Sequence, residues 1–285
     1  MEIEETEEIP NPLAQPHELP QANSNKRVVV ITGGSGGVGL ATARRFSLYS
    51  DIVYNLSRTR QDDNNINWVK TDVTNPEEIK NAFSRIFEKE GQIDVVVNCA
   101  GVGFSGSIEG ADLEVITNVF NVNMSGTAAV CATAIKYMRD KKNGRIINIA
   151  SMSGKFPLPF QSFYSASKAA VINFTHALRT EVAPHNIKVT CVLFSEIRTN
   201  FTEHRIRNNV DDKAYKYRLA KSVAKYEYAE QLGAEPDWVA QKLFALSKKE
   251  NPKATEVFGI INKFRLFAKR ILSEKTINRR IAKKY

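Results

Sequence analysis

A glycine-rich segment that directly follows a short apolar run constrains this 285-residue chain more than any other feature. Residues 27–32 read RVVVIT, which predicts a buried strand, and residues 32–39 read TGGSGGVG and open a helix through about Tyr49. Glycines let a backbone approach a pyrophosphate, and a helix N-terminus offers free N–H groups and a positive dipole end. The segment therefore predicts a dinucleotide-binding loop rather than an ordinary glycine turn. The contacts are expected from Gly33, Ser35, Gly37, Val38 and Gly39.

Five further apolar runs continue an alternation of strands and helices. They span residues 51–56, 67–71, 93–98, 145–150 and 187–193, and a short edge strand is expected near 256–260. The expected helices include one opened by Asn75 and Pro76, a long one ending near Arg139, one after Phe163 and one over 237–249. Apolar strands without polar alternation indicate a parallel sheet covered on both faces. The predicted fold class is α/β, a single doubly wound Rossmann domain that binds ligands beyond the carboxyl ends of its strands.

Charge and composition divide the chain into three parts. Residues 1–25 carry six acids and no Lys or Arg, and we expect them to form a disordered acidic leader. Residues 26–262 form the predicted Rossmann-type domain, in which the basic, aromatic segment 195–235 is expected to be a helical lid over the substrate site. Residues 263–285 hold nine bases against one acid and are expected to form a basic amphipathic tail.

Composition also disfavours several classes of protein and site. No run approaches the ~18 apolar residues that a membrane-spanning helix requires, and the acidic start does not resemble a signal peptide. Three scattered cysteines without a CxxC pattern indicate reduced thiols, and four histidines without ligand spacing indicate no metal site. The bases gather in one terminal patch without a recognition fold, so no nucleic-acid partner is expected. We therefore expect a cytoplasmic protein.

The residue type after the second predicted strand distinguishes between the two nicotinamide cofactors. An acidic residue there would bind the ribose 2′-hydroxyl of NAD, but the chain has Arg58, nineteen residues after Gly39. A guanidinium can bind a 2′-phosphate through bidentate, charge-assisted hydrogen bonds. NADP(H) is the expected cofactor, and a solvated surface arginine is the alternative interpretation.

The pattern Tyr-x-x-x-Lys occurs three times and places two side chains on one helix face. The pairs are Tyr137–Lys141, Tyr164–Lys168 and Tyr217–Lys221. Only Tyr164–Lys168 opens a helix directly after a strand and a loop, where a doubly wound sheet binds its ligands. This pair is therefore the candidate for proton transfer.

A tyrosine with its pKa near ~10 exchanges protons poorly at neutral pH. A neighbouring ammonium favours the phenolate, so we expect Lys168 to lower the pKa of Tyr164 while it also binds the nicotinamide ribose. A third group should bond the substrate oxygen. Ser151 fits because it directly follows the strand over 145–150, and Ser153 is the competing candidate.

Six motifs in order and spacing resemble the short-chain dehydrogenase/reductase family over about residues 27–200. They are TGGSGGVG, Asp72-Val73-Thr74, Asn98-Cys99-Ala100-Gly101, Asn123 in NVNMSG, Ser151, and Tyr164 with Lys168. The resemblance implies that Asp72 contacts the adenine, Asn98 steadies its strand, and Asn123 holds a water that relays protons to Lys168. It further implies that Ser151 polarises the substrate oxygen, that Tyr164 is the general acid or base, and that Thr199 holds the carboxamide. Val73, Ala100 and Gly101 join the implied cofactor site.

The chain departs from this family pattern in two places. Phe194-Ser195 stands where the family usually has Pro-Gly, and Asn251-Pro252-Lys253 with the basic tail replaces a glycine-rich ending. The subgroup with such an ending includes enzymes acting on retinoids, steroids and acylated dihydroxyacetone phosphate, which implies a hydrophobic, lipid-like substrate. The family's habit also implies a homo-oligomer, a dimer or tetramer, paired through the helices around 115–139 and 162–183.

The tail has two interpretations that the sequence leaves open. On a helix, Ile260, Phe264, Phe267 and Ile271 share one face, so the tail could lie on an anionic membrane surface as a peripheral contact. It could equally cap the substrate cleft of its own chain with its basic face in solvent.

The leading hypothesis is a reductase that interconverts a carbonyl and a secondary alcohol. The alternative is a non-enzymatic NADP(H)-binding protein, a redox sensor or scaffold, which the altered turn at Phe194-Ser195 motivates.

Overall fold

The computed structural model describes residues 26–201, 203–207 and 214–285, so the leader predicted over 1–25 lies outside the described residues. Seven strands form one parallel sheet. From one edge to the other they are β3 (Asn67–Lys70), β2 (Ile52–Ser57), β1 (Val28–Thr32), β4 (Val95–Asn98), β6 (Gly144–Ile149), β7 (Ile187–Leu193) and β9 (Thr255–Val257). The strand order reverses between β1 and β4, which creates a crevice at the carboxyl ends of these two strands.

The two faces of β1 show why its residues form a central strand. Val28 and Val30 pack into one core cluster with side chains of helices on one face of the sheet. Val29 and Ile31 pack into a second cluster on the other face. All five β1 residues are buried, so the strand carries no polar alternation, and this is the pattern that its sequence predicted.

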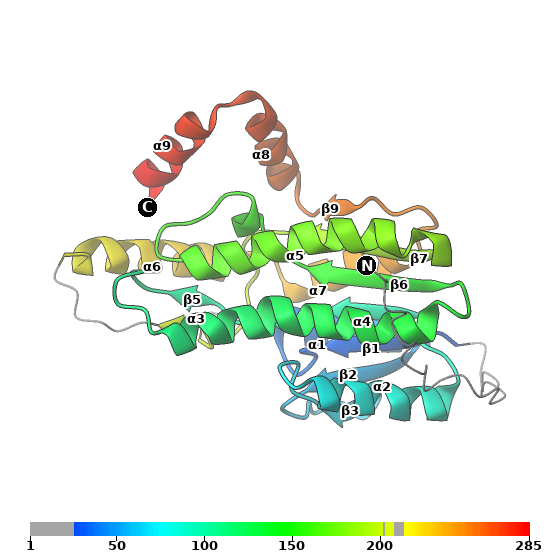
Figure 1. Ribbon diagram of the computed structural model, residues 1–285. Coiled ribbons are helices and arrows are strands. Elements are labelled where there is room, and N and C mark those ends of the chain that lie inside the picture. Colours follow the sequence, from blue (N-terminus) through cyan, green and yellow to red (C-terminus); the bar gives the residue numbers. More distant parts are fainter. Residues whose placement is uncertain (1–25, 202, 208–213) are drawn as a thin grey trace, which may run out of the picture.

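Five helices cover the sheet (Figure 1). Helices α1 (Gly37–Leu48) and α7 (Pro236–Ser247) cover one face, and α2 (Pro76–Glu90), α4 (Thr127–Met138) and α5 (Ser162–Glu181) cover the other. The predicted cap of α2 is confirmed, because Asn75 Oδ1 accepts hydrogen bonds from the backbone N–H groups of Glu77 and Glu78 at 3.1 and 3.3 Å. The α/β fold class and the parallel sheet are therefore as the sequence predicted.

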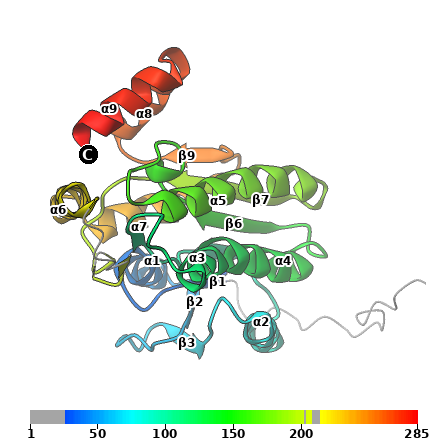
Figure 2. The ribbon, with the colours of Figure 1, turned by 60° about the vertical axis from the view of Figure 1, so that its left-hand side comes forward.

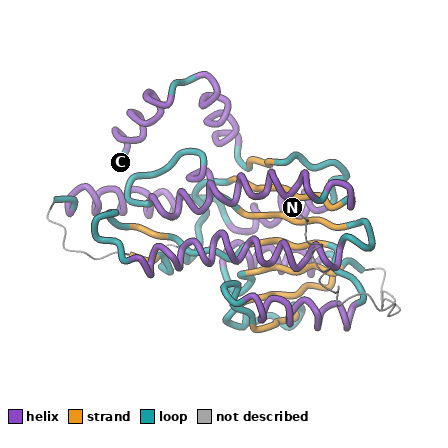
Figure 3. The backbone as a smooth tube through the Cα atoms, in the orientation of Figure 1, coloured by secondary structure: helices purple, strands orange, loops and turns teal. Residues whose placement is uncertain are grey.

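The long helix expected after the fourth strand is more complex than its pattern suggested. It begins as α3 (Leu113–Phe120), continues through a π-helical segment at Asn121–Gly126 and ends as α4, and Figure 3 shows one continuous helical rod. The chain between β4 and α3 forms β5 (Phe104–Ser105), which pairs in parallel with β8 (Ile206–Arg207). Two-residue strands have no measurable periodicity, so the sequence could not predict this small sheet.

The C-terminal segment forms two helices where one was expected. Helix α8 (Ile260–Ile271) begins before the predicted boundary at 263, and α9 (Glu274–Lys284) follows it. Leu272 is extended, and the Ser273 side chain accepts a hydrogen bond from the backbone of Thr276 and caps α9, so the chain turns between the two helices. Figure 2 shows this pair near α6 (Lys216–Gln231), beyond the β9 edge of the sheet. None of the helices in the described ranges is long and apolar enough to cross a bilayer.

The turn into α1 depends on a very close backbone contact at Gly39. A Cβ atom there would lie 2.2 Å from the Gly33 carbonyl oxygen, whereas a Cβ atom at Gly36 would meet nothing within 4 Å. We expect Gly39→Ala to lower the free energy of unfolding by about 2–3 kcal/mol, because backbone must move to relieve the overlap. Gly36→Ala, the matched control, should cost far less. Denaturant titration of both variants measures the difference, and equal losses would contradict this account of the turn.

Candidate active site

A cleft of about 1560 Å³ opens at the carboxyl ends of the strands. Most of the residues that the sequence singled out line it. They are Gly33, Ser35, Gly37, Val38, Gly39, Arg58, Asp72, Val73, Ala100, Gly101, Ser151, Tyr164, Lys168 and Thr199. Asn98 and Asn123 are buried behind its wall. The fold thus brings together segments that lie more than 150 residues apart in the chain.

One end of the cleft is suited to a phosphate group. Helix α1 begins there without a side-chain cap and without an acidic residue in its first turn. Gly36, Gly37, Val38 and Gly39 line the cleft at this point, so the backbone of the helix start faces the open space. An uncapped helix N-terminus carries N–H donors and a partial positive charge, which fit a pyrophosphate.

Thr199 lies directly across from this helix start. A side chain at Gly37, whose φ is +50°, would approach the Thr199 methyl group to 3.3 Å. The Thr199 hydroxyl accepts a hydrogen bond from the backbone of Phe201 at 3.2 Å. Thr199 therefore joins the segment after β7 to the glycine loop, although the Pro-Gly that usually precedes this position in the family is absent.

Ser195, which stands in place of the family's usual Pro-Gly turn, is hydrogen-bonded to α8. The Asn262 amide of α8 donates hydrogen bonds to the Ser195 hydroxyl at 3.1 Å and to the Phe258 carbonyl at 2.9 Å. The Phe194 carbonyl accepts from the backbone of Met152 at 3.0 Å. The altered turn thus anchors the C-terminal helices to the wall of the cleft.

The part of the cleft next to the glycine loop lies beyond β2, the strand that pairs with β1. Ser57 ends this strand, and Arg58 follows it on the surface while lining the cleft. Arg44 of α1 also lines the cleft and forms an ion pair with Asp63 at 3.2 Å. Asp72 forms a turn by accepting hydrogen bonds from the backbone and hydroxyl of Thr74. Arg58 therefore stands at the position after the second strand that the sequence analysis singled out.

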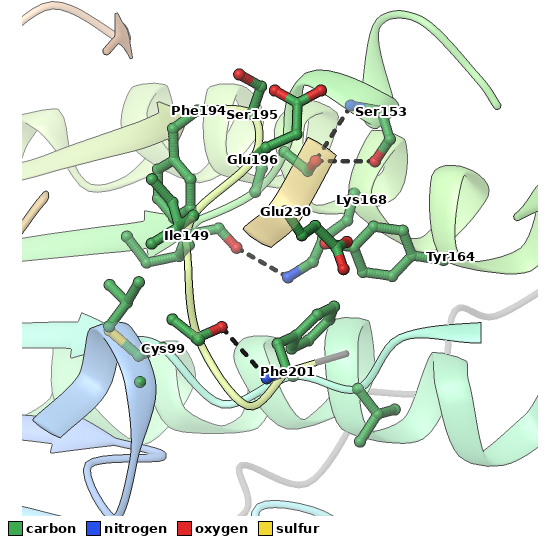
Figure 4. Close-up of a pocket in the computed structure, with 18 of the residues that line it drawn as sticks. Cys99, Ile149, Ser153, Tyr164, Lys168, Phe194, Ser195, Glu196, Phe201 and Glu230 are labelled. Carbon is green, nitrogen blue, oxygen red and sulfur yellow. Dashed lines mark hydrogen bonds between the residues drawn. The ribbon is translucent and has the colours of Figure 1, made fainter. Parts of the chain in front are cut away.

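Lys168 is the buried charge of the site. It is 5% exposed, its Nζ donates to the Ile149 carbonyl at 3.1 Å, and it lies 5.9 Å from the centre of the Tyr164 ring (Figure 4). Ile149 ends β6, so the strand end presents its carbonyl to the ammonium. Burial disfavours the charged form and lowers the pKa of Lys168 to about 8.

Tyr164 differs from the sequence-based expectation in its acidity. The pKa of Tyr164 is raised to about 12. Burial is the main cause and the charge of Glu230 adds to it, while a hydrogen bond with Ser151 and the charge of Arg205 act in the opposite direction. Lys168 is not among the groups that shift this pKa, and desolvation of the phenolate outweighs the charges that do. In this state of the site the phenol holds its proton at neutral pH.

Ser151 and Ser153 both lie in the cleft wall, and their hydrogen bonds show that Ser153 is the donor and Ser151 the acceptor. The Ser153 hydroxyl and backbone N–H donate to the Ser151 hydroxyl oxygen at 2.9 and 3.1 Å (Figure 4). Ser151 thus accepts two hydrogen bonds, and its own proton can be donated to the Tyr164 oxygen, the partner that its hydrogen bond indicates, or to a ligand in the cleft. The competing candidate, Ser153, orients Ser151.

The two buried asparagines join strands and helices behind the cleft. Asn98 donates to Asn148 of the neighbouring strand at 2.8 Å. Asn123, in the π-helical segment, accepts from the backbone of Val102 at 2.8 Å and donates to the Val102 carbonyl and the Ser167 hydroxyl at 3.0 Å each. Asn123 therefore holds the loop after β4 against α5, one residue from Lys168.

The sequence did not predict several side chains that surround Tyr164. Phe201 packs against its ring at 5.8 Å between centroids, and Glu230 of α6 lies close by (Figure 4). Arg205, whose side chain is 2% exposed, pairs with Glu230 at 2.5 Å and packs over Tyr226 at 4.7 Å. The only sequence signal was the pair Glu227 and Glu230, three residues apart on one helix face. This spacing does not indicate that α6 lies near Tyr164 of α5, because α6 reaches the cleft only through tertiary packing.

The other two Tyr-x-x-x-Lys pairs lie away from the site. Tyr137 is half-buried and packs against Phe87 of α2 at 4.9 Å, and Tyr217 is 78% exposed. Neither pair lines the cleft.

The C-terminal helices line the far wall of the cleft. Phe264, Ala268 and Leu272 reach it from the α8 side, and Ile277 and Ile281 from α9. The end of α9 is tied to α6, because the Ser222 hydroxyl donates to the Tyr285 carbonyl at 2.9 Å. Of the two interpretations of the tail, covering the cleft is therefore observed.

Comparisons with known proteins identify relatives of the whole domain. The family described as short chain dehydrogenase matches residues 27–209. The 3-ketodihydrosphingosine reductase of Bacteroides thetaiotaomicron is 33% identical over 229 residues, which cover 79% of this chain and 85% of that protein.

Solved structures share the fold. A short-chain dehydrogenase from Streptomyces avermitilis matches with a TM-score of 0.78 at 24% identity, covering 87% of this chain and 94% of that one. ElxO, solved with NADP bound, matches with a TM-score of 0.67 at 26% identity, covering 81% of this chain and 95% of that one.

The depressed pKa of Lys168 predicts a stability that depends on pH. Burial of the Lys168 ammonium lowers the free energy of unfolding, and this loss is complete below the folded-state pKa of about 8. The loss decreases as the pH rises from 8 to 10.5, the ordinary pKa of a lysine, because the folded state then releases the proton. We expect Lys168→Met to raise the free energy of unfolding at pH 7 by up to about 3 kcal/mol. This advantage over the wild type should shrink between pH 8 and 10.5.

Denaturant titrations across this pH range test the prediction. The exposed Lys136→Met is the control, because it removes no buried charge. A Lys168→Met variant that is less stable than the wild type at pH 7 would contradict it.

Proposed function

Because the chain belongs to the short-chain dehydrogenase/reductase family of oxidoreductases, we propose that it uses NADP(H) to interconvert a carbonyl and a secondary alcohol. The observation that carries this proposal is one continuous cleft. It begins at the uncapped start of α1 and reaches Ser151, Tyr164 and Lys168. A nucleotide site and a proton-transfer group thus share one space.

Tyr164 is the proposed general acid in reduction and the general base in oxidation. Its raised pKa keeps the phenol protonated, which is the form that can donate a proton to a carbonyl oxygen. Ser151 bonds the same oxygen, since Ser153 already occupies its acceptor side. A bound nicotinamide would supply or accept the hydride.

Lys168 fits a supporting role in this reaction. Its ammonium lies beside the Tyr164 ring, where it stabilises negative charge that develops on the phenol oxygen as the proton leaves. Its remaining protons are available to ribose hydroxyls. Asn123, which holds the adjacent loop, is proposed to complete a proton path to Lys168, as the family resemblance implied.

Arg58 supports the choice of NADP(H) over NAD(H). The guanidinium follows the end of β2 and lines the cleft, and no acid ends that strand. The relative ElxO, solved with NADP bound, is consistent with this choice. In the proposed complex, Asp72 and Val73 flank the adenine, and Ala100 and Gly101 form the wall beside the cofactor, with Asn98 buried behind it. Thr199 holds the carboxamide.

The walls around Tyr164 support a hydrophobic substrate. They carry large apolar side chains, which are Phe156, Leu158, Phe201, Phe264 and Leu272. The similarity to a 3-ketodihydrosphingosine reductase, whose name denotes a ketone of a lipid, supports the same class. We therefore propose a ketone with a long apolar part as the substrate of the reductive direction.

A non-enzymatic redox sensor is the second candidate. The Asn262–Ser195 hydrogen bond favours it, since it links the tail to the turn beside the cofactor site. The arrangement of Ser151, Tyr164 and Lys168 favours the enzyme, because a sensor has no need of a proton donor.

Removal of the Tyr164 hydroxyl tests the proposed chemistry. We expect Tyr164→Phe to lower kcat for NADPH-dependent reduction of a hydrophobic ketone by about 10²- to 10⁴-fold, because the general acid is lost. NADPH binding should persist. Tyr217→Phe removes the hydroxyl of an exposed tyrosine from the same sequence pattern and should retain activity. Equal activity of the two variants would contradict the role of Tyr164.

Removal of the Arg58 guanidinium tests the choice of cofactor. We expect Arg58→Ala to weaken NADPH binding by about ten- to a hundredfold while NADH binding changes little, because only NADPH carries the 2′-phosphate. Arg60→Ala is the control, since Arg60 is exposed but does not line the cleft. Fluorescence titration with both cofactors measures the affinities. An unchanged ratio in Arg58→Ala would assign the 2′-phosphate to another group.

A further inference from the structure

Helix α8 presents its apolar side to solvent. Ile260 is 83% exposed, Phe264 70%, Phe267 58% and Ile271 71%, and these residues form one stripe along the helix. Ile261, beside the stripe, is 65% exposed. A surface helix ordinarily buries such a stripe, and a contiguous exposed patch of this kind marks an interaction site.

The opposite side of α8 fixes this orientation. Asn262, 5% exposed, bonds Ser195 and Phe258. Leu266 packs against the core cluster that contains Met152 and Leu193. The Lys269 ammonium donates to the Lys155 carbonyl and lies 5.3 Å from the centre of the Phe156 ring. Turning the helix to bury its apolar stripe would break all of these contacts.

Both C-terminal helices also carry exposed basic side chains. Lys263 and Arg270 are exposed on α8, and the exposed bases of α9 are Lys275, Arg279, Arg280, Lys283 and Lys284. Residues 263–285 carry nine bases and one acid. An exposed apolar stripe on a helix in a strongly basic segment has the chemistry of a helix that lies in the headgroup region of an anionic membrane.

We propose that the outer face of α8 (Ile260, Ile261, Phe264, Phe267 and Ile271) docks this protein on an anionic lipid bilayer surface. The positive charge of the C-terminal segment favours a bilayer over a second copy of the chain as the partner of this face. Two copies that met through this face would bring together two tails with nine bases each, whereas anionic headgroups neutralise them. At 12 residues, α8 suits a position in the plane of the interface.

The docking face and the cleft share Phe264. This residue is exposed in the stripe and also lines the cleft, next to Ala268 and Leu272. A docked protein would therefore hold the α8 side of its cleft against the bilayer. If the proposed function holds, a lipid ketone would pass from the membrane into the cleft beside this helix.

Vesicle sedimentation with the full-length chain tests the docking without a measurement of activity. The vesicles are phosphatidylcholine alone, or phosphatidylcholine with about 30 mol% phosphatidylserine. The test variant is Phe267→Glu/Ile271→Glu, because neither residue lines the cleft. The matched control is Leu48→Glu/Leu113→Glu, which adds the same charge at side chains that are 76% and 75% exposed elsewhere. Thermal unfolding and NADPH titration of each variant check that the fold and the cofactor site remain intact.

We expect the wild type and the control to bind the anionic vesicles and to bind phosphatidylcholine vesicles at least about tenfold more weakly. The test variant should lose about tenfold or more in affinity for the anionic vesicles, with its NADPH affinity unchanged. Absence of wild-type binding, or equal binding by the two double variants, would overturn the proposal. A wild-type dimer that only Phe267→Glu/Ile271→Glu dissociates, without vesicle binding, would also overturn it and assign the face to a second copy. Loss of ketone reduction with docking intact would count against the proposed function alone.

Discussion

The ammonium of Lys168 against the Ile149 carbonyl is the interaction on which the site depends. The charge is buried, so the protein keeps it at a cost that lowers its pKa to about 8. The Ile149 carbonyl is free to accept it because β6 ends at that residue, and α5 places the lysine one turn from Tyr164. One hydrogen bond at a strand end thus joins the sheet to the helix that carries Tyr164, the proposed proton-transfer group.

The doubly wound topology explains why residues distant in sequence meet around this lysine. The order of strands reverses between β1 and β4, and the segments that follow β1, β2, β4, β6 and β7 all enter the same cleft. The C-terminal helices then cover it from the β9 edge, anchored by Asn262 to the turn at Ser195. The same anchor turns the apolar stripe of α8 outward. One contact thus connects the cofactor end of the cleft to the surface of the molecule.

Much of this arrangement could be predicted from sequence because it follows from local patterns. Apolar runs indicated the strands, Asn75 and Pro76 indicated the start of α2, and the position of Tyr164 after a strand separated it from the other Tyr-x-x-x-Lys pairs. The positions of Glu230 and Phe201 beside Tyr164 could not be predicted, because the sequence pattern of the segment after β7 does not indicate how it packs on the sheet. The stripe on α8 was visible, but its outward direction depends on Asn262 and Lys269, which bond distant loops. The predicted direction of the Tyr164 pKa shift was wrong, because burial, which the sequence does not reveal, outweighs the effect of nearby charges.

Transfer of deuterium from NADPH to a substrate carbon tests the central claim most directly. The protein would be incubated with a hydrophobic ketone and NADPH that carries deuterium in both positions of the nicotinamide C4, and the product analysed by mass spectrometry and NMR. The account predicts a secondary alcohol with deuterium on the carbinol carbon, formed by the wild type and about 10²- to 10⁴-fold more slowly by Tyr164→Phe. Oxidation of NADPH without deuterium in the alcohol, or no product with any hydrophobic ketone despite tight NADPH binding, would contradict it.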